Sequence, residues 1–212
     1  MGHFSSEKTV RLLIRRRVGS EEQILLTHEK DERAKKDERG QSGKSGGWSL
    51  PGGGIKKQEK EIFEEIKKLL AVQLRFPKEG GGDRHASQEE YAKYLEVFLG
   101  FNDPPVSELK VILTAVKEGL EESGLLIKPV YELFREPTPN SFNNHELVLL
   151  DCEVVAGLLQ TRSIETDDCR WFGTEKLPDG LYRKHGPWIK RGLEIVRQLE
   201  IDPDLLIETL EN

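Results

Sequence analysis

The sequence predicts an α/β fold in which a mixed β-sheet is covered by helices on both faces. Three observations support this. The first forty-odd residues read as paired strands, the middle of the chain carries apolar residues at helical spacing, and the second half returns to strand-like segments before a terminal helix. This order is typical of a sheet packed between helices. A length of 212 residues suits one domain that carries a large insertion.

The composition excludes several classes of protein. Hydrophobic residues make up 36% of the chain, which is enough for a packed core. The formal charge of −6 argues against a nucleic-acid-binding surface over the whole protein, although a local contact with an RNA 5′ end stays open. Cys152 and Cys169 are too few for a disulfide scaffold or a four-thiolate zinc site. No apolar run could span a bilayer and no signal-peptide pattern is present, so we expect a cytoplasmic protein without membrane contact.

The N-terminal part predicts a β-hairpin. Residues 9–15 and 23–28 are rich in β-forming side chains and lie on either side of a glycine-serine turn. Residues 29–46 are almost free of apolar side chains and predict a solvated loop. A short strand over 48–50 follows, and it ends abruptly at residues 51–54, Pro-Gly-Gly-Gly.

The middle of the chain predicts three helices. Apolar spacing places the first over 58–74, and the glycine-rich residues 76–87 end it. A second helix follows over 88–98, where Ser87 and Glu90 have the spacing of a capping box. The third runs from about residue 107 and closes at the glycine that follows Ser123.

The second half predicts strands over 125–134, 145–155 and 169–172, separated by turn-rich segments. An amphipathic helix follows over 187–199. Asp202-Pro203 then offers an N-cap and a first-turn proline for a last short helix.

Three carboxylates form the most informative pattern. On a helix Glu118 lies one turn from both Glu121 and Glu122, so all three share a face. Like charges placed in this way repel, and a structural role gains nothing from them. A bound Mg²⁺ or Mn²⁺ would reverse the effect, because hard cations prefer carboxylate oxygens and also coordinate phosphates. A solvated helix face is the competing interpretation.

The glycine-rich stretch and this acidic helix together resemble the box of the Nudix hydrolase family, GX5EX7REUXEEXGU, in which U is aliphatic. Gly53 and Glu59 match the first part, and residues 117–125, Lys-Glu-Gly-Leu-Glu-Glu-Ser-Gly-Leu, match the last part. The two parts are separated by about fifty residues more than the seven of the family. The resemblance therefore implies a box that is split by a helical insertion over residues 60–106.

The resemblance implies a Nudix-type α/β/α sandwich over residues 1–212. It also implies Mg²⁺-dependent hydrolysis of the diphosphate linkage in a nucleoside diphosphate derivative, such as ADP-ribose, a nucleotide sugar or a dinucleoside polyphosphate. The implied metal ligands are Glu118, Glu121, Glu122 and the carbonyl of Gly52. Lys117 takes the place of the family arginine, and the implied substrate-binding residues are Trp48, Gly53, Gly54 and Glu59. A general base is also needed, for which Glu165, Glu118 and Glu121 are the candidates.

Three departures from the family pattern favour an alternative, namely the interruption of the box, Lys117 and Gly119. Lys117 keeps the charge of the family arginine but loses its planar fork. Gly119 replaces an aliphatic residue at a cost of about 1 kcal/mol relative to alanine in a helix. Glu59 reads equally well as an ordinary first-turn helix residue. The alternative is a catalytically impaired Nudix-fold protein that senses a nucleotide or an RNA end.

Three further features have open interpretations. The amphipathic helices of the insertion need a partner surface, which suggests a lid over the site or a homodimer contact. Trp48 could stack on a base or pack in the core. His185 lies among aromatic and basic residues that could either read a base or phosphate or form a packing cluster where the last long helix begins.

Overall fold

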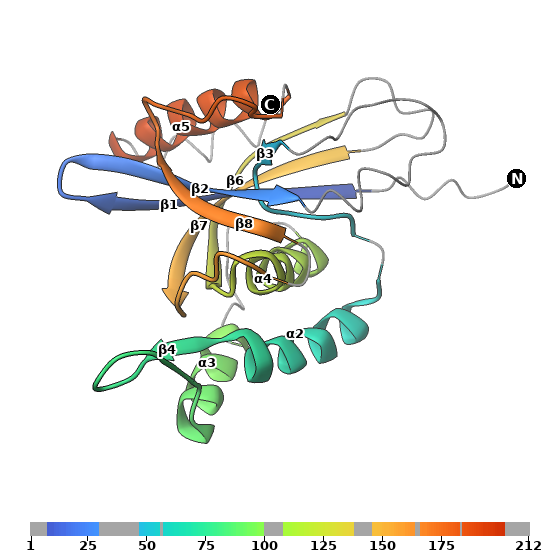
Figure 1. Ribbon diagram of the computed structural model, residues 1–212. Coiled ribbons are helices and arrows are strands. Elements are labelled where there is room, and N and C mark those ends of the chain that lie inside the picture. Colours follow the sequence, from blue (N-terminus) through green and yellow to red (C-terminus); the bar gives the residue numbers. More distant parts are fainter. Residues whose placement is uncertain are drawn as a thin grey trace, which may run out of the picture.

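The computed structural model describes residues 8–29, 47–55, 57–99, 108–137, 146–163, 166–182 and 184–201. A mixed six-stranded sheet occupies the middle of the molecule (Figure 1). Its strands are β1 (Lys8–Val18), β2 (Glu21–Glu29), β3 (Trp48–Ser49), β6 (Leu126–Pro137), β7 (Glu146–Ala156) and β8 (Thr166–Gly173). They follow the order β3-β2-β1-β7-β6, and β8 pairs with β2.

Helices cover both faces of this sheet, which confirms the predicted fold class. They are α2 (Glu59–Gln73), α3 (Gln88–Leu99), α4 (Leu109–Ser123) and α5 (His185–Ile201). Figure 1 shows α5 on one face, α4 on the other, and α2 as a further layer beyond α4. A small hairpin of β4 (Arg75–Pro77) and β5 (Asp83–His85) lies between α2 and α3 in the chain.

Strand β1 is central because it pairs with different partners along its length. Residues 8–14 pair with β7 in parallel, whereas residues 15–18 pair with β2 antiparallel. Leu12, Leu13 and Ile14 are all fully buried, although consecutive strand residues point to opposite faces. Both faces of the sheet are therefore covered at this point.

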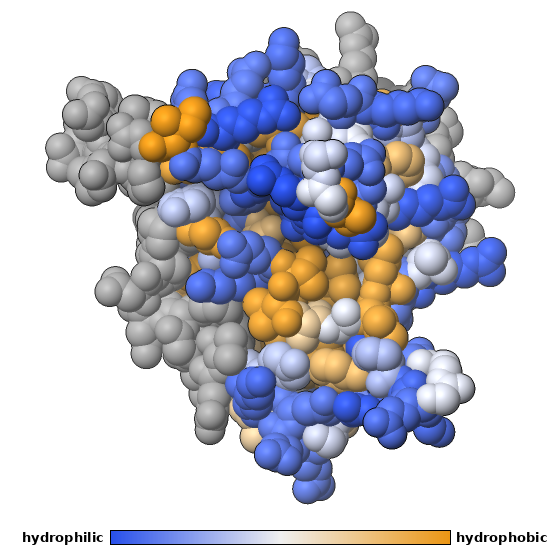
Figure 2. All heavy atoms as spheres, turned by 90° about the vertical axis from the view of Figure 1, so that its left-hand side faces the viewer, coloured by the Kyte–Doolittle hydropathy of each residue, from blue (hydrophilic) through white to orange (hydrophobic). Residues whose placement is uncertain are grey.

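Three apolar clusters hold the layers together, and each cluster joins two neighbouring layers. The first joins the sheet to α4 through residues such as Val10 and Ala115, and the second joins the sheet to α5. The third joins α4 to α2 through residues such as Val116 and Ile66. Partly buried residues such as Val155 and Ala156 pack against this third cluster. Figure 2 shows apolar side chains gathered on one face of the molecule.

Most of the predicted elements are confirmed. The capping box is present, since the Ser87 amide donates to Glu90 and the Glu90 amide donates to the Ser87 hydroxyl. Residues 76–87, which were expected only to end the first helix, also contain most of the β4–β5 hairpin. Both cysteines are free and buried. The last short helix from Asp202 and the basic residues 30–44 lie outside the described ranges. No helix in the described ranges combines the length and apolarity needed to cross a bilayer.

Candidate functional site

The last two turns of α4 carry the acidic residues. The helix closes at Gly124, which has a φ of 71° and donates its amide to the Leu120 carbonyl at 3.0 Å. Glu118 and Glu122 are only 6% and 7% exposed, and Glu121 is partly buried. Buried carboxylates are costly unless they have hydrogen-bond or ionic partners. The partners of these side chains therefore determine what the site can do.

The glycine segment, residues 50–55, lies beside β1 and runs antiparallel to its first half. The Val10 amide donates to the Gly53 carbonyl and the Leu12 amide donates to the Pro51 carbonyl, both at 2.9 Å. Because backbone groups alternate in direction along an extended segment, the peptide groups of the intervening residues point away from β1. The N–H and C=O groups of these residues can therefore bond to side chains from the helices.

The carboxylates of α4 contact this segment directly. Glu122 Oε2 accepts the Gly52 amide at 3.2 Å and the Thr27 hydroxyl at 3.3 Å. Glu118 lies against Gly53, where an added Cβ would come within 2.4 Å of Oε1. Gly52 has a φ of 138°, and a Cβ there would approach a carbonyl oxygen of β1 to 2.2 Å. Glycine at position 53 therefore lets the backbone approach the acidic helix, and glycine at position 52 lets it approach β1.

Lys117 supplies a positive charge within the carboxylate cluster. Its Nζ donates to Glu118 Oε1 at 3.1 Å and also to Glu121 Oε2. Burial acts to lower the pKa of Lys117, but the two carboxylates more than offset this and leave its pKa above the ordinary value. The ammonium group therefore stays charged at neutral pH and holds the two carboxylates together.

Two residues that the sequence did not single out for this role also contact the glycine segment. Arg11 Nη1 donates to the carbonyls of Leu50 and Gly52 at 3.2 and 2.9 Å. From the other side of the sheet, His185 Nδ1 accepts the Leu50 amide at 2.8 Å. The Arg11 contact has no local sequence signal. The ring of His185 contacts Tyr182 and Trp188, as expected from the interpretation of a packing cluster at the start of the last long helix.

Glu59 lies apart from the other box residues. It is the first residue of α2 and is exposed, and the preceding Gln58 accepts a hydrogen bond from Lys110 at 3.5 Å. Lys110 is eight residues before Glu118 on α4, which corresponds to about 12 Å along a helix. The structure thus places Glu59 near the beginning of α4, whereas the carboxylates lie near its end.

The remaining predicted residues have separate environments. Trp48 makes edge-to-face contacts with His28 and Phe172, at ring distances of 5.3 and 4.7 Å, on the α5 side of the sheet. Gly54 continues the glycine segment and forms a bridge with Thr9. Glu165 lies outside the described residues, so its role as general base stays a prediction.

The donor types in this cluster fit a hard divalent cation. Carboxylate and carbonyl oxygens are the ligands that Mg²⁺ and Mn²⁺ prefer, and Glu118 and Glu122 both lie at the glycine segment. In the described part of the chain, no group of three or more His, Cys, Asp or Glu side chains is arranged to hold a metal ion. Lys117 and Arg11 contact the predicted donors instead. A bound cation would have to displace these contacts.

No protein-family model matches the sequence, and no curated protein matches it. Several solved structures are similar in fold. A UDP-X diphosphatase has a TM-score of 0.50 at 17% identity, with 93% of this chain and 66% of that chain covered. A Nudix hydrolase from Nitrosomonas europaea has a TM-score of 0.50 at 15% identity, with 91% and 73% covered. An ADP-ribose pyrophosphatase from Streptococcus suis has a TM-score of 0.48 at 20% identity, with 91% and 93% covered.

The fold of the chain is therefore that of the Nudix hydrolases, an α/β/α sandwich with a mixed sheet. In this fold the two segments that resemble the family box lie side by side. The glycine segment and the acidic end of α4 are in contact despite the insertion between them in the sequence.

Proposed function

We propose that the protein is a divalent-cation-dependent hydrolase that cleaves the diphosphate linkage of a nucleoside diphosphate derivative. Mg²⁺ is the proposed ion and Mn²⁺ the alternative. One observation carries the proposal, namely that the nearly buried carboxylates of Glu118 and Glu122 lie against the glycine segment. Buried carboxylates in this arrangement give a rigid set of hard oxygen donors beside a backbone that lacks side chains.

Each residue of the cluster has a role that follows from its contacts. Glu122 is oriented by the Gly52 amide and the Thr27 hydroxyl, so one of its oxygens is fixed while the carboxylate faces the segment. Glu118 uses the space that Gly53 leaves free. The chemistry that a bound magnesium ion supplies is neutralisation of diphosphate charge and acidification of water. Glu118, Glu121 and Glu165 remain the candidates for the general base.

Lys117 would change partners during such a cycle. Its ammonium contacts both Glu118 and Glu121, and like charges in a site of low dielectric repel strongly. A cation held by Glu118 or Glu121 would therefore compete with the Lys117 ammonium for the same carboxylate oxygens. Replacing Lys117 with a neutral residue should change the cation affinity more than it changes the stability of the fold.

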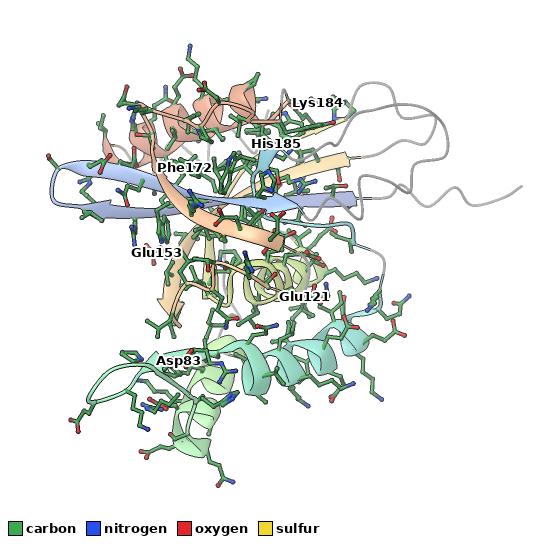
Figure 3. All side chains as sticks on the ribbon, viewed as in Figure 1. Asp83, Glu121, Glu153, Phe172, Lys184 and His185 are labelled. Carbon is green, nitrogen blue, oxygen red and sulfur yellow. The ribbon has the colours of Figure 1, made fainter. Side chains whose placement is uncertain are left out.

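A substrate panel tests the proposal. The full-length protein is incubated with Mg²⁺ or Mn²⁺ and with ADP-ribose, UDP-sugars, dinucleoside polyphosphates, NADH, nucleoside triphosphates or capped RNA. Glu122→Gln should lower kcat by roughly 100-fold or more, since even residues that only support a metal ligand are worth 10- to 100-fold. Glu153→Gln is the matched control, because Glu153 is exposed on β7, away from the Glu121 end of α4 (Figure 3). Equal activity in both variants would contradict the proposal.

A second candidate function has its own supporting observation. Lys117 already contacts two of the three predicted metal ligands, and Arg11 contacts the Gly52 carbonyl. Cations of the chain itself could thus keep a metal out and leave a protein that binds a nucleotide or an RNA end without turnover. A ligand that raises Tm without any product in the same panel supports this alternative.

A further inference from the structure

The glycine segment is held from both sides of the sheet. On the α4 side, the Gly52 amide donates to Glu122. On the α5 side, the Leu50 amide donates to Nδ1 of His185 at 2.8 Å. Leu50 is fully buried and His185 is 2% exposed, so water does not compete for this bond. Figure 3 shows His185 and Glu121 on opposite sides of the strands.

The imidazole of His185 is held firmly in place. His185 is the first residue of α5, and its own amide donates to the Tyr182 carbonyl at 2.8 Å. The ring makes an edge contact with Tyr182 at 5.1 Å and a tilted contact with Trp188 at 5.0 Å. The Tyr182 amide in turn donates to the Trp48 carbonyl, which precedes the glycine segment by two residues. The ring is therefore fixed relative to the strand that leads into the site.

The Leu50 bond adds an anchor on the edge of the segment that faces away from β1. The carbonyls of Pro51 and Gly53 bond to β1, so the peptide groups of Leu50 and Gly52 face the opposite way. An anchor at the Leu50 amide therefore also orients the Gly52 amide, two residues further on the same edge. That amide is the group that positions Glu122.

We propose that His185 is a positioning residue for the carboxylate site, and that it acts through the Leu50 amide on Gly52 and then on Glu122. The bond requires a lone pair on Nδ1, so a neutral ring carries its proton on Nε2. Its effect on turnover rests on the hydrolase function proposed above. Its effect on the backbone of the glycine segment does not.

Two variants separate this role from simple packing. His185→Phe keeps an aromatic ring between Tyr182 and Trp188 but removes the acceptor. His185→Asn loses the ring but keeps an oxygen that can lie near the position of Nδ1. We expect kcat to fall by roughly 10- to 100-fold in His185→Phe, as for other residues that orient a ligand, with little change in KM. His185→Asn should stay closer to the wild type. The reverse ranking would show a packing role and would overturn the proposal.

Nuclear magnetic resonance provides a readout that needs no activity. In the wild-type protein, an N–H···N bond should give a scalar coupling between the ¹⁵N nuclei of the Leu50 amide and His185 Nδ1. In His185→Phe, the Gly52 amide should exchange faster with solvent than in His185→Asn. Absence of the coupling, or equal Gly52 exchange in both variants, would overturn the proposal. A wild-type protein without hydrolase activity but with both signals would refute the proposed function and leave the positioning role standing.

Discussion

The two buried faces of α4 differ in what they contribute. The face towards the sheet is apolar at Val111 and Ala115 and becomes acidic at Glu118 and Glu122, where the glycine segment replaces side-chain packing. The face towards α2 stays apolar along its whole length, with the residues Leu113, Val116 and Leu120. One face of the helix therefore carries the candidate chemistry, and the other stabilises the fold.

This difference changes the interpretation of the insertion. A lid or a dimer contact could be removed without harm to the domain, and both roles stay predictions. Ile66 and Leu70 of α2 are fully buried in the cluster that covers α4. The Gln160 side chain also donates to the Gln73 carbonyl, and the Leu158 amide donates to the Arg75 carbonyl at 2.9 Å. The insertion therefore contributes a layer of the apolar core.

The largest expected effect is the loss of the fold when residues 61–104 are deleted. The deletion exposes the apolar face of α4, and truncating even one such buried leucine costs about 2–5 kcal/mol. We expect aggregated protein or protein without a cooperative thermal transition, measured by circular dichroism and gel filtration. Val72→Ala, on an exposed position of α2, is the control and should leave Tm unchanged. A deletion variant that kept its fold, activity and oligomeric state would contradict the comparison and also the lid and dimer interpretations.

The next effect concerns the acidic face. In Gly53→Ala, the new Cβ would lie 2.4 Å from Glu118 Oε1. The neighbour that must move is the end of a flexible side chain, so Glu118 should shift while the backbone stays in place. We expect cation affinity and kcat to fall by roughly 10- to 100-fold, as when a ligand is misoriented. Tm should change little.

Isothermal titration with Mn²⁺ and a thermal melt check this expectation together. Gly54→Ala is a useful companion, because Gly54 is exposed in the same segment. A large loss of Tm without loss of cation affinity in Gly53→Ala would show that the segment serves the fold alone.

A smaller effect is expected at Gly119, where the family pattern has an aliphatic residue. A Cβ there would lie 2.8 Å from Cγ1 of Ile127, which is fully buried and cannot retreat easily. Overpacking typically costs about 1–3 kcal/mol, and helix propensity returns about 1 kcal/mol when glycine becomes alanine. We therefore expect Gly119→Ala to lower the free energy of unfolding by about 1 kcal/mol.

A double-mutant cycle tests the cause of that loss. In an Ile127→Ala background the two closest crowding atoms are absent and only the Leu125 carbonyl oxygen lies near, at 3.3 Å, so Gly119→Ala should stabilise the protein instead. If Gly119→Ala were equally costly in both backgrounds, Ile127 would not explain the glycine. Urea unfolding of the four proteins measures both values.

Much of the fold could be predicted because its signals are local. Apolar spacing identified α2, α4 and α5, and the Ser87–Glu90 capping box located the start of α3. The β4–β5 hairpin was missed, since its strands have only three residues each and enclose a run of glycines that reads as a turn. Short strands depend on tertiary contacts more than on their own sequence.

The site could be predicted only in part, for a related reason. The identities of Glu118, Glu121 and Glu122 follow from spacing on one helix, whereas the contacts of Glu118 and Glu122 with the glycine segment required the fold. The bonds from Arg11 and His185 to the segment join residues 39 to 135 positions apart, and no local pattern encodes them. Long-range backbone anchors of this kind become visible only in the structure.

The smallest expected effect is at Glu59, and it tests whether the split box works as one unit. The family resemblance implies that Glu59 binds substrate, although the sequence reads equally well with Glu59 as an ordinary first-turn helix residue. In the structure Glu59 is an exposed acidic residue at the start of α2. Its negative charge there interacts with the positive end of the helix dipole and stabilises the helix by at most about 1 kcal/mol. Glu59→Gln should therefore leave kcat and cation affinity unchanged and lower Tm slightly, whereas Glu118→Gln should lower kcat strongly. If Glu59→Gln abolished activity, the residue that precedes the insertion would have to reach the acidic end of α4 during turnover, and the division of α4 into a chemical and a structural face would fail.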